Sequence, residues 1–171
     1  NNNEIRKLND IAQKYNIKYQ NKHKLDLVDE ILSNVDVIPN SIVLAQAAIE
    51  SGWGKSRFAK EYNALFGEYT YDDSEGVIPL ERENGDTHLI KAFSSYSNSV
   101  ESYFDNINSH YAYEDFRDIR NIMRKRNNFS NVNLLVNKLS TYAEDENYIK
   151  TIRQVIKTNN FSIFDQKTIS Y

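Results

Sequence analysis

Residues 44–56 read Leu44-Ala45-Gln46-Ala47-Ala48-Ile49-Glu50-Ser51-Gly52-Trp53-Gly54-Lys55-Ser56, and the rest of the chain is organised around this run. Apolar residues recur at 44–45 and 48–49, which is the stripe of an amphipathic helix, and the helical pattern ends in a Gly-Trp-Gly break. On a helix, Gln46, Glu50 and Trp53 lie at i, i+4 and i+7 and share one flank of the stripe. The spacing therefore predicts a carboxylate at the edge of a core, in the last turn of a helix.

Glu50 has an unusual setting for a helical glutamate. An ordinary amphipathic helix with its glutamate in water remains one interpretation. A carboxylate near a helix C-terminus, however, opposes the helix dipole by about 0.3–1 kcal/mol. Two glycines bracket the chain's single tryptophan directly afterwards. Partial burial of a carboxyl group favours its use as a proton donor, so we expect a site for a sugar or another ring-shaped ligand here.

Composition restricts the class of protein. The 171 residues suit one domain, and the 40% hydrophobic and 26% charged residues are typical of a globular chain. A net charge of −3 argues against a nucleic-acid partner, and the absence of cysteine excludes disulfides and thiol chemistry. No apolar run approaches the ~18 residues of a membrane span, and no signal-peptide pattern is present. Because the first residue is Asn, we expect a piece of a longer protein.

The hydrophobic periodicity predicts a mainly helical chain with a small β insertion. Helices are expected over 4–15, 25–35, 41–50, 56–61, 98–109, 113–126, 132–142 and 145–158, with strands over 66–71, 77–83 and 86–93. The tail from residue 159 is expected to be irregular and to dock through its phenylalanines. Asn84-Gly85 predicts a two-residue hairpin turn, which would place Glu83 opposite Asp86 and Glu81 opposite His88, with Pro79 on an edge. The predicted fold class is α+β, mainly α, in one domain 1–171 with a helical lobe (about 1–65 and 94–171) and a β lobe (about 66–93).

Three motifs occur in a fixed order along the chain. Residues 45–54 read Ala-Gln-Ala-Ala-Ile-Glu-Ser-Gly-Trp-Gly, residues 63–67 read Asn-Ala-Leu-Phe-Gly, and residues 142–148 read Tyr-Ala-Glu-Asp-Glu-Asn-Tyr. Together they resemble the glucosaminidases of glycoside hydrolase family 73. In that family the last motif is Tyr-Ala-Thr-Asp-Pro-x-Tyr, so Glu144 and Glu146 depart from the pattern. The resemblance extends over about residues 38–158. Within the family, the chain is similar to the Bax-like branch through residues 76–79 and 108–110.

The resemblance implies a lysozyme-like fold whose β lobe flanks a substrate cleft, and an enzyme that cuts the glycan strand of peptidoglycan. Glu50 matches the catalytic acid of the family. Glu81 falls where the family carries a glutamate in the β lobe, with Glu83 as the alternative, because strand alternation turns both to the same face. Three mechanisms remain open: inversion with a general base, a carboxylate nucleophile, or attack by the substrate's own acetamido group with Tyr142 or Tyr148 in support.

Substrate-binding candidates divide by chemistry. Aromatic rings that could stack on sugars are those of Trp53, Phe66, Tyr142 and Tyr148, and amides that could bind acetamido groups are those of Gln46, Asn63 and Asn147. For each ring a place in the core is an equally good interpretation, and each amide could equally bind backbone. The three histidines lack the spacing of a catalytic zinc site, so neither a metal nor another cofactor is expected.

The sequence thus predicts an endo-β-N-acetylglucosaminidase that acts on bacterial peptidoglycan. A muramidase or lytic transglycosylase on the same fold is the nearest alternative, and a wall-binding module without catalysis is another. We expect a monomer with no nucleic-acid partner and no membrane span, secreted or associated with the cell wall.

Overall fold

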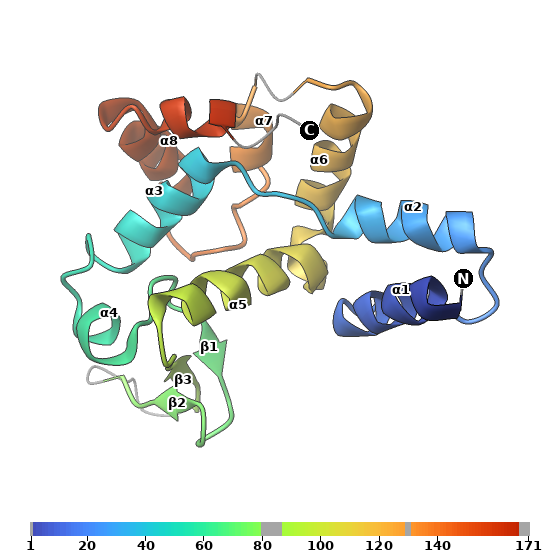
Figure 1. Ribbon diagram of the computed structural model, residues 1–171. Helices are drawn as coiled ribbons and strands as arrows, with labels where there is room; N and C mark the ends of the chain where they lie inside the picture. Colours follow the sequence, from blue (N-terminus) through green and yellow to red (C-terminus); the bar gives the residue numbers. More distant parts are fainter. Residues whose placement is uncertain (1, 80–86, 129–130, 168–171) are drawn as a thin grey trace. The chain divides into compact units, whose positions relative to one another are not determined.

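The computed structural model describes residues 2–79, 87–128 and 131–167. Its elements, in chain order, are α1 (Asn2–Lys14), α2 (Lys24–Asn34), α3 (Asn40–Glu50), α4 (Arg57–Tyr62), β1 (Tyr69–Thr70), β2 (Gly76–Val77), β3 (Leu89–Lys91), α5 (Tyr96–Ser109), the 3₁₀ helix η1 (Tyr111–Tyr113), α6 (Glu114–Lys125), α7 (Asn133–Val136), α8 (Tyr148–Thr158) and the 3₁₀ helix η2 (Phe161–Lys167) (Figure 1). This confirms the predicted α+β class, since the described elements are mainly helices with one small antiparallel sheet.

The chain divides into two compact units. One contains residues 1–39 and 105–153, and the other contains residues 40–104 and 154–171. The boundaries fall inside α5 and α8, so each of these helices contributes to both units. The sheet shares a unit with α3, α4 and the first part of α5, which differs from the predicted grouping into a helical lobe and a β lobe.

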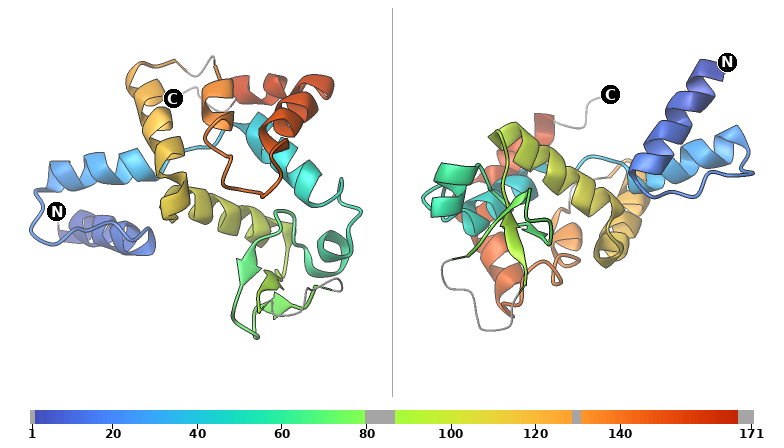
Figure 2. Two further views of the ribbon diagram at one scale, coloured as in Figure 1. Left: turned by 180° about the vertical axis from the view of Figure 1, so that it is seen from behind. Right: turned by 90° about the horizontal axis from the view of Figure 1, so that it is seen from below.

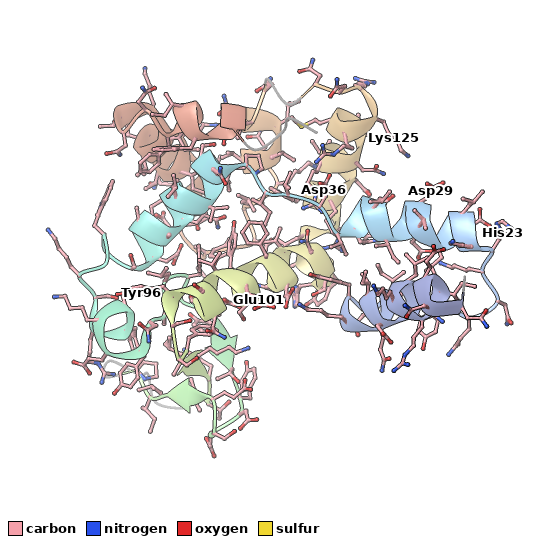
Figure 3. The ribbon with its side chains drawn as sticks, in the orientation of Figure 1. His23, Asp29, Asp36, Tyr96, Glu101 and Lys125 are labelled. Carbon is pink, nitrogen blue, oxygen red and sulfur yellow. The ribbon has the colours of Figure 1, made fainter. Side chains whose placement is uncertain are left out.

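In the first unit, α1 and α2 lie side by side (Figures 1 and 2). Their shared core consists of Ala12, Ile17, Leu27 and Ile31. The α2 helix begins after His23, whose Nδ1 accepts a hydrogen bond from the N–H of Leu25 at 3.4 Å (Figure 3). The apolar core holds α1 and α2 together, and the C-terminal end of α2 is bound by α6.

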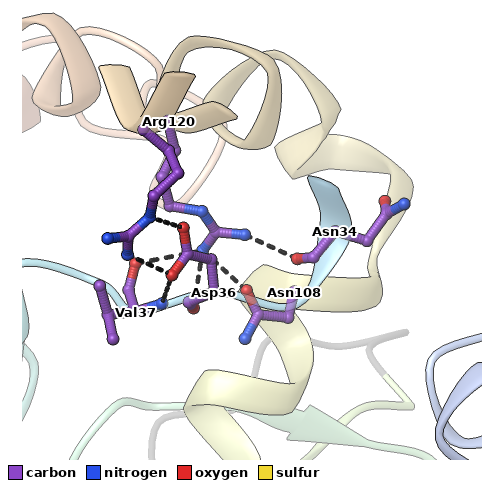
Figure 4. A network of polar contacts seen from close by, with 6 residues as sticks. Asn34, Asp36, Val37, Asn108 and Arg120 are labelled. Carbon is purple, nitrogen blue, oxygen red and sulfur yellow. Dashed lines mark hydrogen bonds and ion pairs between the residues drawn. The ribbon is translucent and has the colours of Figure 1, made fainter. Parts of the chain in front are cut away.

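A buried arginine joins the end of α2 to α6 and α5. Arg120 is fully buried and donates to the carbonyl of Asn34 at 2.6 Å, the carbonyl of Asp36 at 3.0 Å and Oδ1 of Asn108 at 2.7 Å (Figure 4). One turn further along α6, Arg124 binds the Asp36 carboxylate through Nε at 2.9 Å and Nη2 at 2.5 Å. Carbonyl oxygens at a helix C-terminus carry partial negative charge, so the carbonyl of Asn34 helps to stabilise the buried guanidinium.

In the second unit, the sheet has the order β1-β3-β2 with both pairs antiparallel. Thr70 and Leu89 pair on one face, and Leu89 is buried. On that face Lys91 Nζ contacts Ser102 Oγ of α5 at 3.4 Å, so this face of the sheet packs toward α5. The first residue of α5 is also anchored, because the hydroxyl of Tyr96 donates to the carbonyl of Ala59 in α4 at 3.2 Å (Figure 3).

The sheet corrects two sequence predictions. The strands are only two or three residues long, and Val77 pairs with Ile90 rather than with Ala92, the partner that a two-residue turn would impose. Gly76 explains the register, because a Cβ at Gly76 would lie 2.5 Å from Cβ of Leu89, so only glycine fits beside Leu89. The predicted Asn84-Gly85 turn and the Glu83–Asp86 and Glu81–His88 pairs lie outside the described residues. Pro79 lies after the end of β2 instead of within a strand.

Two helical predictions also need correction. The helix predicted over 132–142 is a single turn, α7, followed by i→i+3 bonds such as Leu139 N–H to Val136 O at 3.1 Å. These turns suffice to bury Leu135 and Leu139 completely, so a longer helix is not needed. The tail predicted to be irregular forms the 3₁₀ helix η2.

The η2 helix packs along α3. Oδ1 of Asp165 accepts from the backbone N–H of Ser41 at 2.8 Å, and Nδ2 of Asn40 donates to the carbonyl of Phe164 at 3.0 Å. At the other end of α3, the rings of Trp53 and Phe161 have centroids 6.5 Å apart. The predicted start of this helix at Pro39-Asn40-Ser41 is therefore right, but a carboxylate from the tail binds its first turn. Among residues 2–79, 87–128 and 131–167, no helix has the length and apolarity needed to cross a membrane.

Candidate active site

Glu50 is the last residue of α3, as the sequence predicts. It is half-buried, and the residues behind it on the helix, Ala45, Gln46 and Ala48, are buried. The last turn of α3 contains no basic residue that would offset the negative end of the helix dipole. The negative end of the helix dipole therefore lies at Glu50, where the sequence predicts it.

The chain leaves α3 through a Schellman turn. The N–H of Trp53 donates to the carbonyl of Ala48 at 2.7 Å and the N–H of Gly52 to that of Ile49 at 3.2 Å, with Gly52 in the left-handed region at φ 57°. Ser51 reinforces the turn, because its Oγ accepts from the N–H of Gly54 at 2.8 Å.

Trp53 has a strained backbone and an exposed ring. Its φ is 58°, a left-handed value that costs a bulky residue roughly 1–3 kcal/mol, and its side chain is 55% exposed. Gly54 continues the left-handed run at φ 71°. Strain that presents a flat apolar ring to solvent, three residues after Glu50, is consistent with the predicted role of Trp53 in sugar binding.

The Asn63–Gly67 motif places the backbone of Gly67 next to the Glu50 carboxyl group. Asn63 ends α4 in the left-handed region at φ 53°, and its Nδ2 donates to the carbonyl of Phe93 at 2.9 Å. The N–H of Leu65 donates to Ser99 Oγ at 3.1 Å. The motif ends at Gly67, with φ 62°, where an added Cβ would lie 3.6 Å from Oε2 of Glu50. Each of these positions thus has a local structural role, and the last one lies beside the carboxyl group.

Phe66 and Gln46 support the site from within. Phe66 is 2% exposed and its ring is stacked on that of Tyr103, with centroids 4.2 Å apart and planes 19° apart. The hydroxyl of Tyr103 donates to Oε1 of Gln46 at 2.6 Å, and both side chains are fully buried. The amide of Gln46 therefore binds a tyrosine of α5 in this arrangement, and direct contact of Gln46 or Phe66 with a sugar stays a prediction.

The third motif, residues 142–148, lies in the other unit and brings two tyrosines together. The rings of Tyr142 and Tyr148 are parallel within 3°, with centroids 5.8 Å apart, and Tyr113 lies 6.1 Å from Tyr142. The motif's Asp145 makes the turn between them, because its Oδ1 accepts from the N–H of Asn147 at 2.8 Å. Tyr148 is buried, Tyr142 is half-buried and Asn147 is exposed. The motif thus encodes a stacked tyrosine pair at the start of α8.

The predicted site residues fall into three groups. Glu50, Gln46, Trp53, Asn63 and Phe66 lie in one unit, and Tyr142, Asn147 and Tyr148 lie in the other. Glu81 and Glu83 lie outside the described residues. Three residues that support the site were not predicted: Gly67 beside Glu50, Tyr103 on Gln46, and Asp165 at the opposite end of α3. Only Gly67 had a signal in the sequence, as the last residue of a motif. Among the described residues, no group of three or more His, Cys, Asp or Glu side chains could hold a metal ion.

Comparison with known proteins gives a consistent result. Residues 25–161 match the family model "Glucosaminidase: Mannosyl-glycoprotein endo-beta-N-acetylglucosaminidase". Protein Bax of Escherichia coli (strain K12) is 34% identical over 137 residues, which are 80% of this chain and 48% of Bax. The peptidoglycan hydrolase FlgJ of the same strain is 35% identical over 92 residues, 48% of this chain and 29% of FlgJ. The chain therefore spans about half the length of Bax and less than a third of FlgJ.

A solved structure shows the same fold. The catalytic domain of the autolysin Auto from Listeria monocytogenes superposes with a TM-score of 0.55 at 20% identity, covering 92% of this chain and 85% of that one. The α+β architecture is that of a lysozyme-like glycoside hydrolase domain. The chain belongs to the glucosaminidase family, that of the endo-β-N-acetylglucosaminidases, because the family model matches most of its length.

Proposed function

We propose that this chain hydrolyses the β-1,4 bond after N-acetylglucosamine in the glycan strand of bacterial peptidoglycan, with Glu50 as the general acid. One observation carries the proposal. A half-buried carboxyl group ends α3, and the left-handed Gly67 brings backbone without a side chain next to its Oε2. Cleavage of a glycosidic bond needs such a proton donor next to the leaving oxygen.

The second catalytic group is Glu81 in this proposal, with Glu83 as the alternative. A carboxylate roughly 6.5–9.5 Å from Glu50 would act as the general base of an inverting enzyme, and one at roughly 5–5.5 Å would act as a nucleophile. In a substrate-assisted reaction neither carboxylate attacks, and Tyr142 stabilises the reacting acetamido group. Within its own unit, the half-buried Tyr142 ring is backed by the parallel ring of Tyr148, and this rigid pairing supports the proposed role.

The substrate-binding residues in this proposal are Trp53, Asn147 and Tyr148, with Gln46, Asn63 and Phe66 in support. FlgJ is named a peptidoglycan hydrolase and Auto an autolysin, and these names favour the cell wall as the substrate of this chain too. We place its action outside the cytoplasm, secreted or wall-associated, as a monomeric domain.

The test compares Glu50→Gln with Glu61→Gln on purified cell wall. Glu61 is an exposed glutamate of α4 in the same unit, so its replacement controls for the loss of one negative charge. We expect Glu50→Gln to lower the release of soluble glycan by at least about 100-fold, the contribution of a general acid, and Glu61→Gln to leave it unchanged. Circular dichroism confirms that both variants fold. Equal activity of Glu50→Gln and Glu61→Gln would refute the role of Glu50.

Mass spectrometry of the released fragments identifies the bond. N-acetylglucosamine at the reducing end supports the proposal. Reducing or anhydro N-acetylmuramic acid would instead show a muramidase or a lytic transglycosylase. Retention of the chain on the wall without any soluble product would show a binding module. Glu81→Gln and Glu83→Gln, assayed separately, show which of the two is the second catalytic carboxylate.

A further inference from the structure

We propose that Tyr69, with the tilted ring of His88 in contact with it, forms a sugar-stacking subsite for the glycan strand next to Glu50. This inference rests on the proposed function, because it concerns the same substrate, but it assigns a binding role to two residues outside the three motifs.

The two rings form a preformed platform on the sheet. The ring centroids of Tyr69 in β1 and His88, just before β3, are 4.3 Å apart with planes 31° apart. Tyr69 pairs with Ile90, so residues 69, 88 and 90 lie on one face of the sheet by strand alternation. Thr70 and the buried Leu89 lie on the other face, which packs toward α5. The Tyr69–His88 platform is therefore on the face turned away from α5.

Tyr69 is exposed although it is a large aromatic residue in an ordered strand. Its exposed fraction is 64%, so the ring does not contribute to the core. A flat ring with one open face stacks on the apolar C–H face of a sugar, while its hydroxyl remains available for a hydrogen bond. Contact with His88 restricts the ring before the ligand arrives, which reduces the entropy lost on binding.

The chain path places this platform close to the candidate acid. Gly67 lies beside Glu50, and Tyr69 follows two residues later. Two residues span at most about 7 Å of chain, so the Tyr69 backbone lies within the length of a short oligosaccharide from the Glu50 carboxyl group. A glycan strand whose scissile bond lies at Glu50 would extend past the position of Tyr69.

The size of the platform favours a saccharide over a protein partner. Stable protein interfaces bury about 1,200–2,000 Å² in total, far more than one tyrosine and one histidine offer. A single sugar ring covers one aromatic ring and needs no charged partner. A neutral N-acetylglucosamine ring of the glycan strand is the ligand that matches this surface.

The experiment measures binding without turnover, in the Glu50→Gln background. The probes are a chitooligosaccharide and soluble glycan strands from purified wall that has been stripped of its peptides. We expect Tyr69→Ala and Tyr69→Leu to raise the Kd about tenfold and Tyr69→Phe to leave it within about twofold. His88→Ala should raise the Kd less than Tyr69→Ala, because the stacking ring remains. Tyr111, 81% exposed and in contact with His110 at the same 31° between ring planes, is the matched control outside the sheet, and Tyr111→Ala should not change the Kd.

In the wild-type background, Tyr69→Ala should raise the KM about tenfold and leave kcat within about threefold. The leucine variant separates loss of the ring from loss of strand structure, since leucine keeps the apolar bulk. An unchanged Kd in both Tyr69→Ala and Tyr69→Leu, or an equal loss in Tyr111→Ala, would overturn the subsite. If the wild-type chain releases no glycan yet Tyr69→Ala weakens binding, the subsite stands and the proposed hydrolysis fails. If the wild-type chain cleaves glycan with an unchanged KM in the Tyr69 variants, the subsite alone fails.

Discussion

Replacement of Gly67 by alanine tests whether backbone at the end of the second motif shapes the reaction site. Gly67 has φ 62°, a value that costs a residue with a Cβ roughly 1–2 kcal/mol. The added Cβ would lie 3.6 Å from Oε2 of Glu50, which is ordinary van der Waals contact, so strain rather than a clash sets the loss of stability. For a chain of this length, 1 kcal/mol corresponds to about 2–4 °C, so we expect the Tm to fall by about 2–8 °C.

Activity should fall further than stability explains. The methyl group would contact Oε2 of Glu50, and we expect this contact to restrict the movement of the carboxyl group that proton transfer requires. We expect kcat/KM to fall at least about tenfold, equivalent to about 1.4 kcal/mol in the activation free energy. The assay is the initial rate of glycan release well below the Tm of the variant, normalised to folded protein.

Gly54→Ala is the matched control for backbone strain. Gly54 also has a left-handed φ, 71°, but a Cβ there would meet no atom within 4 Å. The two variants should therefore lose similar stability, and only Gly67→Ala should lose most of its kcat. If Gly67→Ala keeps its kcat, or if Gly54→Ala loses as much, the space beside Glu50 is not what Gly67 provides.

Two further predictions concern the ends of the chain. Asp165→Ala removes the carboxylate that binds the first turn of α3. We expect the free energy of unfolding in urea to fall by about 1 kcal/mol in this variant, with Asp165→Asn closer to the wild type. Equal stability of all three proteins would contradict the capping role. The hydrogen bond and charge of Lys24 lower the pKa of Glu4. The contact therefore stabilises the fold fully above the unfolded-state pKa of Glu4. This stabilisation is lost as the pH falls through the lowered folded-state pKa. An NMR titration should show the Glu4 pKa returning upward to its ordinary value in Lys24→Met, and an unchanged titration curve would exclude the interaction.

Local sequence signals predicted the helices and the place of Glu50 well. The α3 helix begins and ends within one residue of its predicted range, because apolar spacing, a proline before it and glycines after it all act over a few residues. The motif matches likewise predicted the family, since each motif forms a local structure of its own. Asn63 ends α4, and Asp145 turns the chain between Tyr142 and Tyr148.

The sheet depended on contacts that local rules do not contain. Its register follows from the close approach of Gly76 to Leu89, thirteen positions along the chain, and a turn propensity cannot report such an approach. The predicted turn at Asn84-Gly85 lies outside the described residues and stays a prediction, whereas the pairing of Val77 with Ile90 is set by packing around Gly76.

The sequence by itself determined the family, the helical framework and the candidate acid, because these depend on periodicity and on short motifs. Only the tertiary structure decided what surrounds that acid. It brings Gly67 to the Glu50 carboxyl group, turns Phe66 inward onto Tyr103 and leads Asp165 back to the start of α3, 124 residues away in sequence. Such contacts join segments that are distant along the chain, and their free energy arises only when the whole unit packs.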